Sequence, residues 1–280
     1  MNRREFIKTL GVAGLFTFVS GKISKLFGGV MEHKEGKNYW EKGYFIQENV
    51  KIGKNIIKAK IERKWYEFKT RELPQEFIEW SLKKRIKDIE KIKKGKMPEL
   101  AGPHSGAVAT YGAGRKDTQF TLNNAIKGIG FVPKEEKIEE IIKNIKKTAE
   151  ASMAEKLSFL KSLYQDGKTL FDMKKQVSLE LYTTKDFETH TFLNIMENPV
   201  ATIVFLDIPS FELRTIARIV HPKDKTATDY EKKILKYTNL IHSYFHGKFR
   251  RTFPVLIFHV IEVFDNSPGD KRGIRIVPPR

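Results

Sequence analysis

The spacing of apolar residues predicts two long helices before residue 166. The first begins after Pro74 and ends near Gly95 and Pro98. Its apolar face consists of Ile78, Leu82, Ile86, Ile89 and Ile92. The second keeps the same period from Ile138 to Leu160, about seven turns, and ends at Gly167. Because each run has one apolar stripe, both helices are expected to cover a core.

Short strands are predicted on either side of the first helix. Segments 49–53 and 56–61 alternate as β-structure before it. After it, the glycine-rich stretch 99–132 contains the apolar run 107–111 followed by Gly112 and Gly114. This pair of glycines lacks the third glycine and the following helix of a dinucleotide-binding loop, so it predicts a hairpin turn instead.

The last 110 residues or so give the clearest pattern. Strands are predicted at 177–182, 200–206, 212–220 and 253–264, joined by a turn at 208–210, a short helix at 186–196 and a longer helix. The longer helix begins with a capping box at Thr228 and Glu231 and ends at Gly247. Hairpin-linked strands with interposed helices predict an α+β fold, in which an antiparallel sheet closes into a small barrel.

These patterns divide the chain into four predicted parts. Residues 1–30 form a leader, 31–44 a linker, 45–165 an N-terminal extension with short strands and two long helices, and 166–280 a split-barrel-like domain with flanking helices. With the leader removed, the rest has enough chain to bury a sizeable core.

The leader has the layout of a twin-arginine export signal. Arg3 and Arg4 stand just before an apolar run from Thr9 to Gly21, which at roughly 13 residues is short for a spanning helix. Segment 19–21 is only a loose cleavage site, so cleavage and retention as an anchor both stay open. We expect the export machinery to place the protein in the periplasm or tethered to the outer side of the inner membrane. Because this route carries folded proteins, a cofactor bound before export is expected.

Composition limits which cofactors and partners the protein can have. The chain has no cysteine, which excludes disulfides, iron–sulfur clusters, covalently attached haem and cysteine zinc sites. The net charge is +18, but the lysines alternate with glutamates along segments such as 83–96 and 134–147. A nucleic-acid groove would instead interleave aromatics with arginine. This charge pattern therefore favours contact with an anionic membrane surface over nucleic-acid binding.

The C-terminal pattern resembles the pyridoxamine 5′-phosphate oxidase-like family, the FMN-binding split barrels. The resemblance covers about 168–265 and rests on Tyr182-Thr183-Thr184, on His190-Thr191 and on segment 194–199, which ends in Asn-Pro. It implies a homodimer that binds FMN and acts as a flavin-dependent oxidoreductase. The candidate cofactor-binding residues are Tyr182, Thr183, Thr184, Lys185, His190, Thr191, Arg214 and Arg218.

Elementary chemistry agrees with this candidate set. Hydroxyls and amides at a helix start are good phosphate donors, and Lys185, Arg214 or Arg218 could add positive charge. Two features depart from the family. Its usual Lys or Arg on the short helix is replaced by segment 188–191, so non-covalent haem, with His190 as a contact, stays open as the alternative ligand. The first barrel hairpin lies either at 107–114, before a long helical insertion, or within 168–180.

Other interpretations stay open at this stage. Thr183 and Thr184 could simply cap a helix, Arg214 and Arg218 could face solvent, and the fold could be a cofactor-free envelope protein. His242 and His246 have the spacing of a metal-binding pair on one helix face, but no third ligand accompanies them in the sequence pattern. His259 stands in an apolar strand and is expected to be a satisfied core or rim histidine rather than a catalyst.

Overall fold

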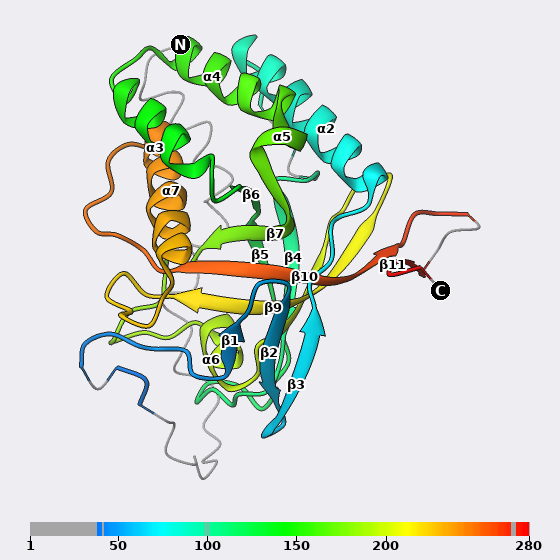
Figure 1. Cartoon of the computed structure of the whole chain (residues 1–280), viewed down its shortest axis with the longest axis vertical. Helices are drawn as coiled ribbons and strands as arrows, with labels where there is room; N and C mark the ends of the chain where they lie inside the picture. The colour runs from blue at the N-terminus through cyan, green and yellow to red at the C-terminus, as the bar shows by residue number, and fades with distance from the viewer. Residues whose placement is uncertain (1–37, 41, 98, 100, 270–272, 280) are drawn as a thin grey trace.

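A computed structural model describes residues 38–40, 42–97, 99, 101–269 and 273–279 (Figure 1). Its centre is an antiparallel sheet of eight strands, strongly curled into a half-barrel, with helices against it. The α+β class and the curled antiparallel sheet predicted from the sequence are confirmed. The predicted leader, with Arg3 and Arg4, and the linker up to residue 37 lie outside the described residues.

The strand order places the last long strand at the centre and a short strand at one edge. The sheet runs β5-β4-β8-β9-β10-β7-β6, and β11 also pairs with β10. The strands are β4 (Ser105–Thr110), β5 (Asn123–Gly128), β6 (Gly130–Pro133), β7 (Phe171–Leu179), β8 (Val200–Val204), β9 (Phe211–Val220), β10 (Val255–Asp265) and β11 (Ile274–Val277). The sheet therefore takes strands from both sides of residue 166.

The central strand β10 is buried on both faces. Its residues 255–260 are all buried, which explains why its sequence is a continuous apolar run rather than an alternating one. One face packs against the helical layer, and on the other face Ile261, together with Ile216 of the neighbouring strand β9, packs against a separate small sheet. The two faces are thus covered by different layers, helices that include α7 on one and the small sheet on the other.

The helices gather on one side of the curled sheet (Figure 1). They are α2 (Gln75–Lys93), α3 (Ile138–Lys147), α4 (Met153–Gln165), α5 (Gly167–Leu170) and α7 (Asp229–His246), while α6 (His190–Glu197) lies at the other end of the sheet. Helix α2 begins at Pro74 and α7 ends before Gly247, as predicted. The capping box between Thr228 and Glu231 is also present.

The prediction of one continuous helix from 138 to 160 is wrong. Helix α3 ends at Lys147, and α4 starts after Ser152, whose side chain accepts from the backbone N–H of Glu155 while the Glu155 carboxylate accepts from the Ser152 N–H. This capping box satisfies the donors of a new helix start, so it stabilises a break within the apolar period. The break lets the chain reverse direction and places α4 beside α2.

The small sheet confirms the short strands predicted between 45 and 68. It contains β1 (Val50–Ile52), β2 (Ile56–Ile61) and β3 (Lys64–Lys69), in that order. The chain before it is tied to the main sheet by buried amides: Gln47 accepts from the Ile219 N–H at 2.7 Å, and Asn49 donates to Met196 O at 2.9 Å. These bonds attach the N-terminal segment to α6 and β9.

Two predicted boundaries near the candidate site shift. The strand expected at 177–182 is β7 and ends at Leu179, and the short helix begins at His190 because Thr189 caps it. A hairpin compressed into 168–180 is also wrong, since α5 and the single strand β7 occupy that segment. The hairpin at 107–114 is confirmed as β4 pairing with β5 across a long connection. No helix within the described ranges is both long and apolar enough to cross a membrane.

Candidate functional site

A cleft of about 1200 Å³ opens at the β5 edge of the half-barrel. We call it the edge cleft; its lining comes from β4, β5, the loop 111–122 between them, the segment 182–191 that begins α6, and the end of β8. Strand β5 pairs only with β4 among the described strands, so its other side is an uncovered sheet edge. The cleft is therefore bounded by an edge of the sheet rather than by its buried centre.

The wall of the edge cleft is unusually apolar for a surface. Phe120, Ile126 and Leu206 line it and are each about three-quarters exposed, at 74%, 75% and 79%. Leu122 and Tyr182 line it as well and are more than half exposed. Soluble proteins rarely leave so many large apolar side chains together in water, and such patches mark interaction surfaces. This wall is the strongest indication of a binding site in the described chain.

Polar groups stand beside this wall. Arg115 donates from Nε to Asp117 Oδ1 at 2.6 Å, and a second bond joins its terminal nitrogen to the other carboxylate oxygen. These bonds hold the pKa of the Asp117 carboxyl below its usual range. Asn123 donates to Thr191 Oγ1 at 3.0 Å, which ties β5 to α6. The cleft thus combines an apolar wall with a guanidinium, an amide and a hydroxyl.

A buried ion pair supports the floor of the site. Lys127, on β5, contacts Glu180 Oε2 at 2.9 Å, and the Glu180 side chain is fully buried. The other Glu180 oxygen accepts from Thr183 and Thr189 at 3.3 Å each. Because removing one member of a buried pair leaves an uncompensated charge, Lys127 and Glu180 fix the position of β5 relative to the 180–189 segment.

The side chain of Asn194 bonds to both ends of the loop 111–122. This residue is fully buried on α6. Its Oδ1 accepts from the Ala113 N–H at 2.8 Å, and its Nδ2 donates to Thr110 Oγ1 at 3.1 Å and to Thr121 O at 3.0 Å. Gly112 has φ +126°, and a Cβ there would lie 3.1 Å from Asn198 Cβ, so the loop start requires glycine. Asn194 therefore joins both ends of the loop to α6.

Three of the predicted residues line the edge cleft. Tyr182, His190 and Thr191 all face it. His190 is 8% exposed, and its Nε2 lies 3.0 Å from Ala113 O. The structure thus brings the predicted strand end and helix start together at a cavity, next to the glycine-rich hairpin.

Thr183, Thr184 and Lys185 lie behind or beside the cleft. Thr183 is buried, and its hydroxyl bonds to Glu180 and Thr189. Thr184 Oγ1 accepts from the Asp186 and Phe187 N–H groups in a tight turn. Lys185 is exposed and pairs with Asp186 at 3.1 Å. The two threonine hydroxyls therefore serve the local chain.

Arg214 and Arg218 lie away from this site. Arg218 is buried on β9 and contacts Asp224 at 2.7 Å and Glu231 at 2.9 Å, and it also donates to Gln47 O at 3.2 Å. Arg214 is exposed and pairs with Glu212 at 2.9 Å. Neither arginine lines the edge cleft. Arg218 is surrounded by protein partners that tie β9 to the start of α7.

The residues that the sequence pattern missed come mainly from the loop and strand between 111 and 128. Phe120, Leu122 and Ile126 have an apolar spacing that could equally belong to a core, and Arg115 has no motif around it. A glycine-rich loop carrying isolated large apolar residues was the only signal available. Only the pairing of β5 at the sheet edge reveals that these side chains face outward.

Metal binding finds no support in the described residues. No group of three or more His, Asp or Glu side chains there is arranged to hold a metal ion. His242 and His246 have ring centroids 6.0 Å apart, and burial lowers the pKa of His242 to about 4. His259 is buried in the core, but its Nε2 has no hydrogen-bond partner among the described residues, so the expectation of a satisfied histidine is wrong. Burial lowers its pKa to about 3.

Comparison with known proteins assigns no function to this cleft. No protein-family model matches the chain, and no curated protein shows significant similarity to it.

Proposed function

We propose that the protein is an exported flavoprotein of the FMN-binding split-barrel type and that the edge cleft holds FMN. The observation that carries the proposal is the exposed apolar wall of the cleft, formed by Phe120, Ile126 and Leu206 at an uncovered sheet edge beside polar donors. Small-molecule sites combine such a wall with a few convergent polar groups. The curled antiparallel sheet is compatible with a split barrel.

The side chains present fit an isoalloxazine ring. The apolar wall suits the face of a flat tricyclic ring, and the Asn123 and Asn124 amides on β5 offer donors and acceptors for its polar edge. Thr191, which accepts from Asn123, and His190 line the cleft next to these amides. FMN, once bound, supplies hydride and electron transfer, which makes a flavin-dependent oxidoreductase the expected activity. The substrate would enter the same cleft.

Arg115 is the best phosphate donor at this site. Its pair with Asp117 is solvent-accessible, with 29% and 61% of the two side chains exposed. Exposed ion pairs contribute only about 0–1 kcal/mol, so a dianionic phosphate competes well for the planar guanidinium. This assignment replaces the predicted role of Thr183, Thr184 and Arg218, whose polar groups already bond to neighbouring residues.

A second copy of the chain is expected to complete the site. Strand β5 offers unpaired backbone groups at its outer side, and Ile126 and Phe120 extend the apolar surface there. An exposed apolar edge strand is a template for pairing with another chain. We therefore propose a homodimer that encloses the flavin between two protomers, as the family resemblance implies.

Haem is the second candidate ligand, because His190 lines the cleft and could contact a planar macrocycle. Its Nε2 bonds to Ala113 O, so ligation through that nitrogen would have to break this contact. FMN leaves this contact intact and has only to displace the exposed pair of Arg115 with Asp117, so we place it first. A cofactor-free envelope protein is the third outcome, in which the cleft serves only as a protein contact.

The experiment is a titration of the purified full-length protein with FMN, followed by quenching of flavin fluorescence, with a parallel haem titration followed in the Soret region. Ile126→Glu places a charge on the apolar wall and is expected to weaken FMN binding at least tenfold. Ile56→Glu, at an exposed position of the small sheet, is the matched control and leaves binding unchanged. Absence of saturable FMN binding by the unmodified protein overturns the proposal.

Export is tested separately from the cofactor. Replacing Arg3 and Arg4 by lysine keeps the charge but removes the twin-arginine pair, so the protein should remain inside the cell. Cell fractionation detects the change. Continued export of this variant would remove the twin-arginine route from the proposal while leaving the flavin test intact.

A further inference from the structure

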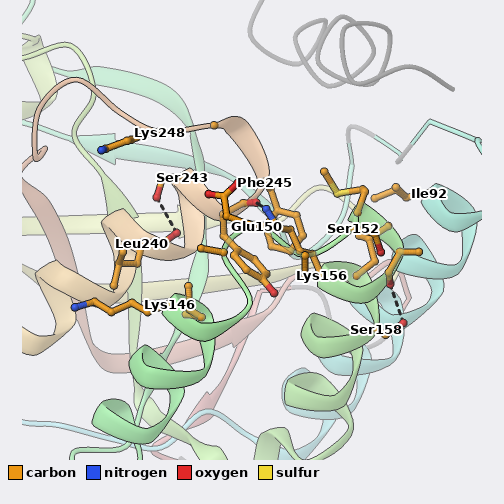
Figure 2. Close-up of a pocket in the computed structure, with 18 of the residues that line it drawn as sticks. Ile92, Lys146, Glu150, Ser152, Lys156, Ser158, Leu240, Ser243, Phe245 and Lys248 are labelled. Atoms are coloured by element: carbon orange, nitrogen blue, oxygen red, sulfur yellow. Dashed lines mark hydrogen bonds between the residues drawn. The ribbon is translucent and has the colours of Figure 1, made fainter.

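A second cavity lies at the far end of the helical layer and has a different chemistry. It measures about 1080 Å³ and is lined by the ends of α2 and α7 and by the connection from α3 to α4 (Figure 2). We call it the helical pocket. It shares no lining residue with the edge cleft. The break between α3 and α4, which the sequence pattern did not predict, creates part of its wall.

The floor of the helical pocket is aliphatic and aromatic. Ile92, Met153, Leu240 and Phe245 are half-buried and line it, and Tyr244 is buried beneath them. Two serines of the lining already have hydrogen-bond partners within the protein: Ser243 donates to Leu240 O at 3.0 Å, and Ser158 donates to Ala154 O at 2.8 Å. An alkyl chain lying on this floor would therefore not break the hydrogen bonds of these serine hydroxyls.

Lysines surround this floor. Lys93, Lys146, Lys156 and Lys248 line the pocket, with Glu150 as its acidic residue. Among the residues that the structure describes, Lys146 and Lys248 lie within ion-pair distance of no carboxylate. Figure 2 shows both on the Leu240 side of the pocket and Ile92 on the opposite side. Lys93 donates to Ser158 Oγ and Lys156 to Tyr244 O, each at 3.1 Å, so the lysines best placed to meet an anion are those at the Leu240 end.

We infer that the helical pocket binds a free long-chain fatty acid. The carboxylate lies at the Lys146 and Lys248 end, and the alkyl chain runs across Leu240 and Phe245 toward Ile92. Charge complementarity selects this occupant, because lysines on a protein of net charge +18 attract an anion and disfavour a basic segment of the same chain. A hollow of this size also fits a single alkyl chain, whereas a bilayer presents a flat surface.

The test is calorimetric titration of the full-length protein with sodium dodecanoate below its critical micelle concentration. Saturable binding is expected, and dodecanol, which lacks the charge, should bind at least tenfold more weakly. The double variant Lys146→Gln/Lys248→Gln is expected to weaken dodecanoate binding at least tenfold. Lys64→Gln/Lys69→Gln, at exposed positions of the small sheet, changes the net charge equally and should leave it unchanged.

Four results would overturn the inference. They are no saturable dodecanoate binding, equal weakening by both double variants, and dodecanol binding as tight as dodecanoate. The fourth is binding only to phosphatidylglycerol vesicles and not to monomeric dodecanoate, which would make this face a membrane contact. Sedimentation velocity of the pocket variant completes the test, because a change in oligomeric state without loss of dodecanoate binding would assign the face to a second copy of the chain.

Discussion

The two cavities have similar volumes, about 1200 and 1080 Å³, but different elements and different side chains line them. The edge cleft has large apolar side chains exposed on a sheet edge, with Arg115 and a few amides beside them. The helical pocket has an apolar floor between helix ends and a rim of lysines. The first suits a flat aromatic ligand with one phosphate, and the second suits a flexible anionic amphiphile.

The difference follows from how strands and helices present side chains. On β5 alternate residues project from one face, so Ile126 stands exposed beside Asn124, and residues of the preceding loop and of the segment after β8 complete the apolar wall. At helix ends, lysines are favoured by the helix dipole and extend past the apolar stripe, as Lys146 does in the last turn of α3. Each predicted ligand class is thus a consequence of local chain geometry, and variants can separate the two cavities.

The largest expected effect comes from Arg218, which lines neither cavity. Arg218→Met leaves the Asp224 and Glu231 carboxylates buried without their partner, and it should lower the free energy of unfolding by about 3–5 kcal/mol. Chemical denaturation measures the change. The folded variant should bind FMN with unchanged affinity, and Arg214→Met, an exposed control, should cost about 0–1 kcal/mol. A selective loss of FMN affinity in Arg218→Met would restore its predicted role in phosphate binding.

The next effect separates the edge cleft from the helical layer. Asn194→Ala removes the hydrogen bonds that hold the ends of loop 111–122. It should lower the free energy of unfolding by about 1–3 kcal/mol and also weaken FMN binding. Asn239→Ala is the matched control, because Asn239 likewise bonds Phe253 through both its amide nitrogen and its oxygen. Asn239→Ala should lower the free energy of unfolding by a similar amount and leave FMN affinity unchanged. Equal effects of both variants on FMN binding would remove the special role of the loop.

The smallest effect is a pH dependence of stability caused by His259, which lines neither cavity. His259, on the central strand β10, has its pKa lowered by burial to about 3 from the ordinary 6.5. Below pH 6.5 the unfolded chain binds a proton that the folded chain does not, so stability falls as pH falls toward 3. Between pH 7 and 5.5 this histidine should account for about 1 kcal/mol of the loss. In His259→Leu the drop measured by urea denaturation should be smaller by that amount; an unchanged drop would contradict it.

The sequence was most informative where one face of an element is buried. The strand at 200–206, the capping box at Thr228 and the end of α7 before Gly247 were all identifiable, because periodicity and capping chemistry act locally. The break between α3 and α4 was missed because Ala149 and Met153 keep the apolar period through it. Here a local cap overrides a pattern that suggests continuity.

Only a small part of the edge cleft could be found from the sequence. Tyr182, His190 and Thr191 were identified because a strand end followed by a helix start places polar groups at a sheet edge. Arg218 was assigned to the site although it is buried among carboxylates, since β9 is buried on both faces and alternation gives no information there. The apolar wall at 120–126 depends on which strand ends the sheet, and strand order is a long-range property.

The most direct test of the account is a fluorescence titration of the full-length protein with FMN, in the absence and presence of saturating dodecanoate. The account predicts saturable quenching with one FMN per chain, abolished or weakened at least tenfold by Ile126→Glu and unaffected by dodecanoate, because the two cavities share no lining residue. Absence of saturable quenching, or equal affinity in Ile126→Glu, would contradict the assignment of the edge cleft as a flavin site.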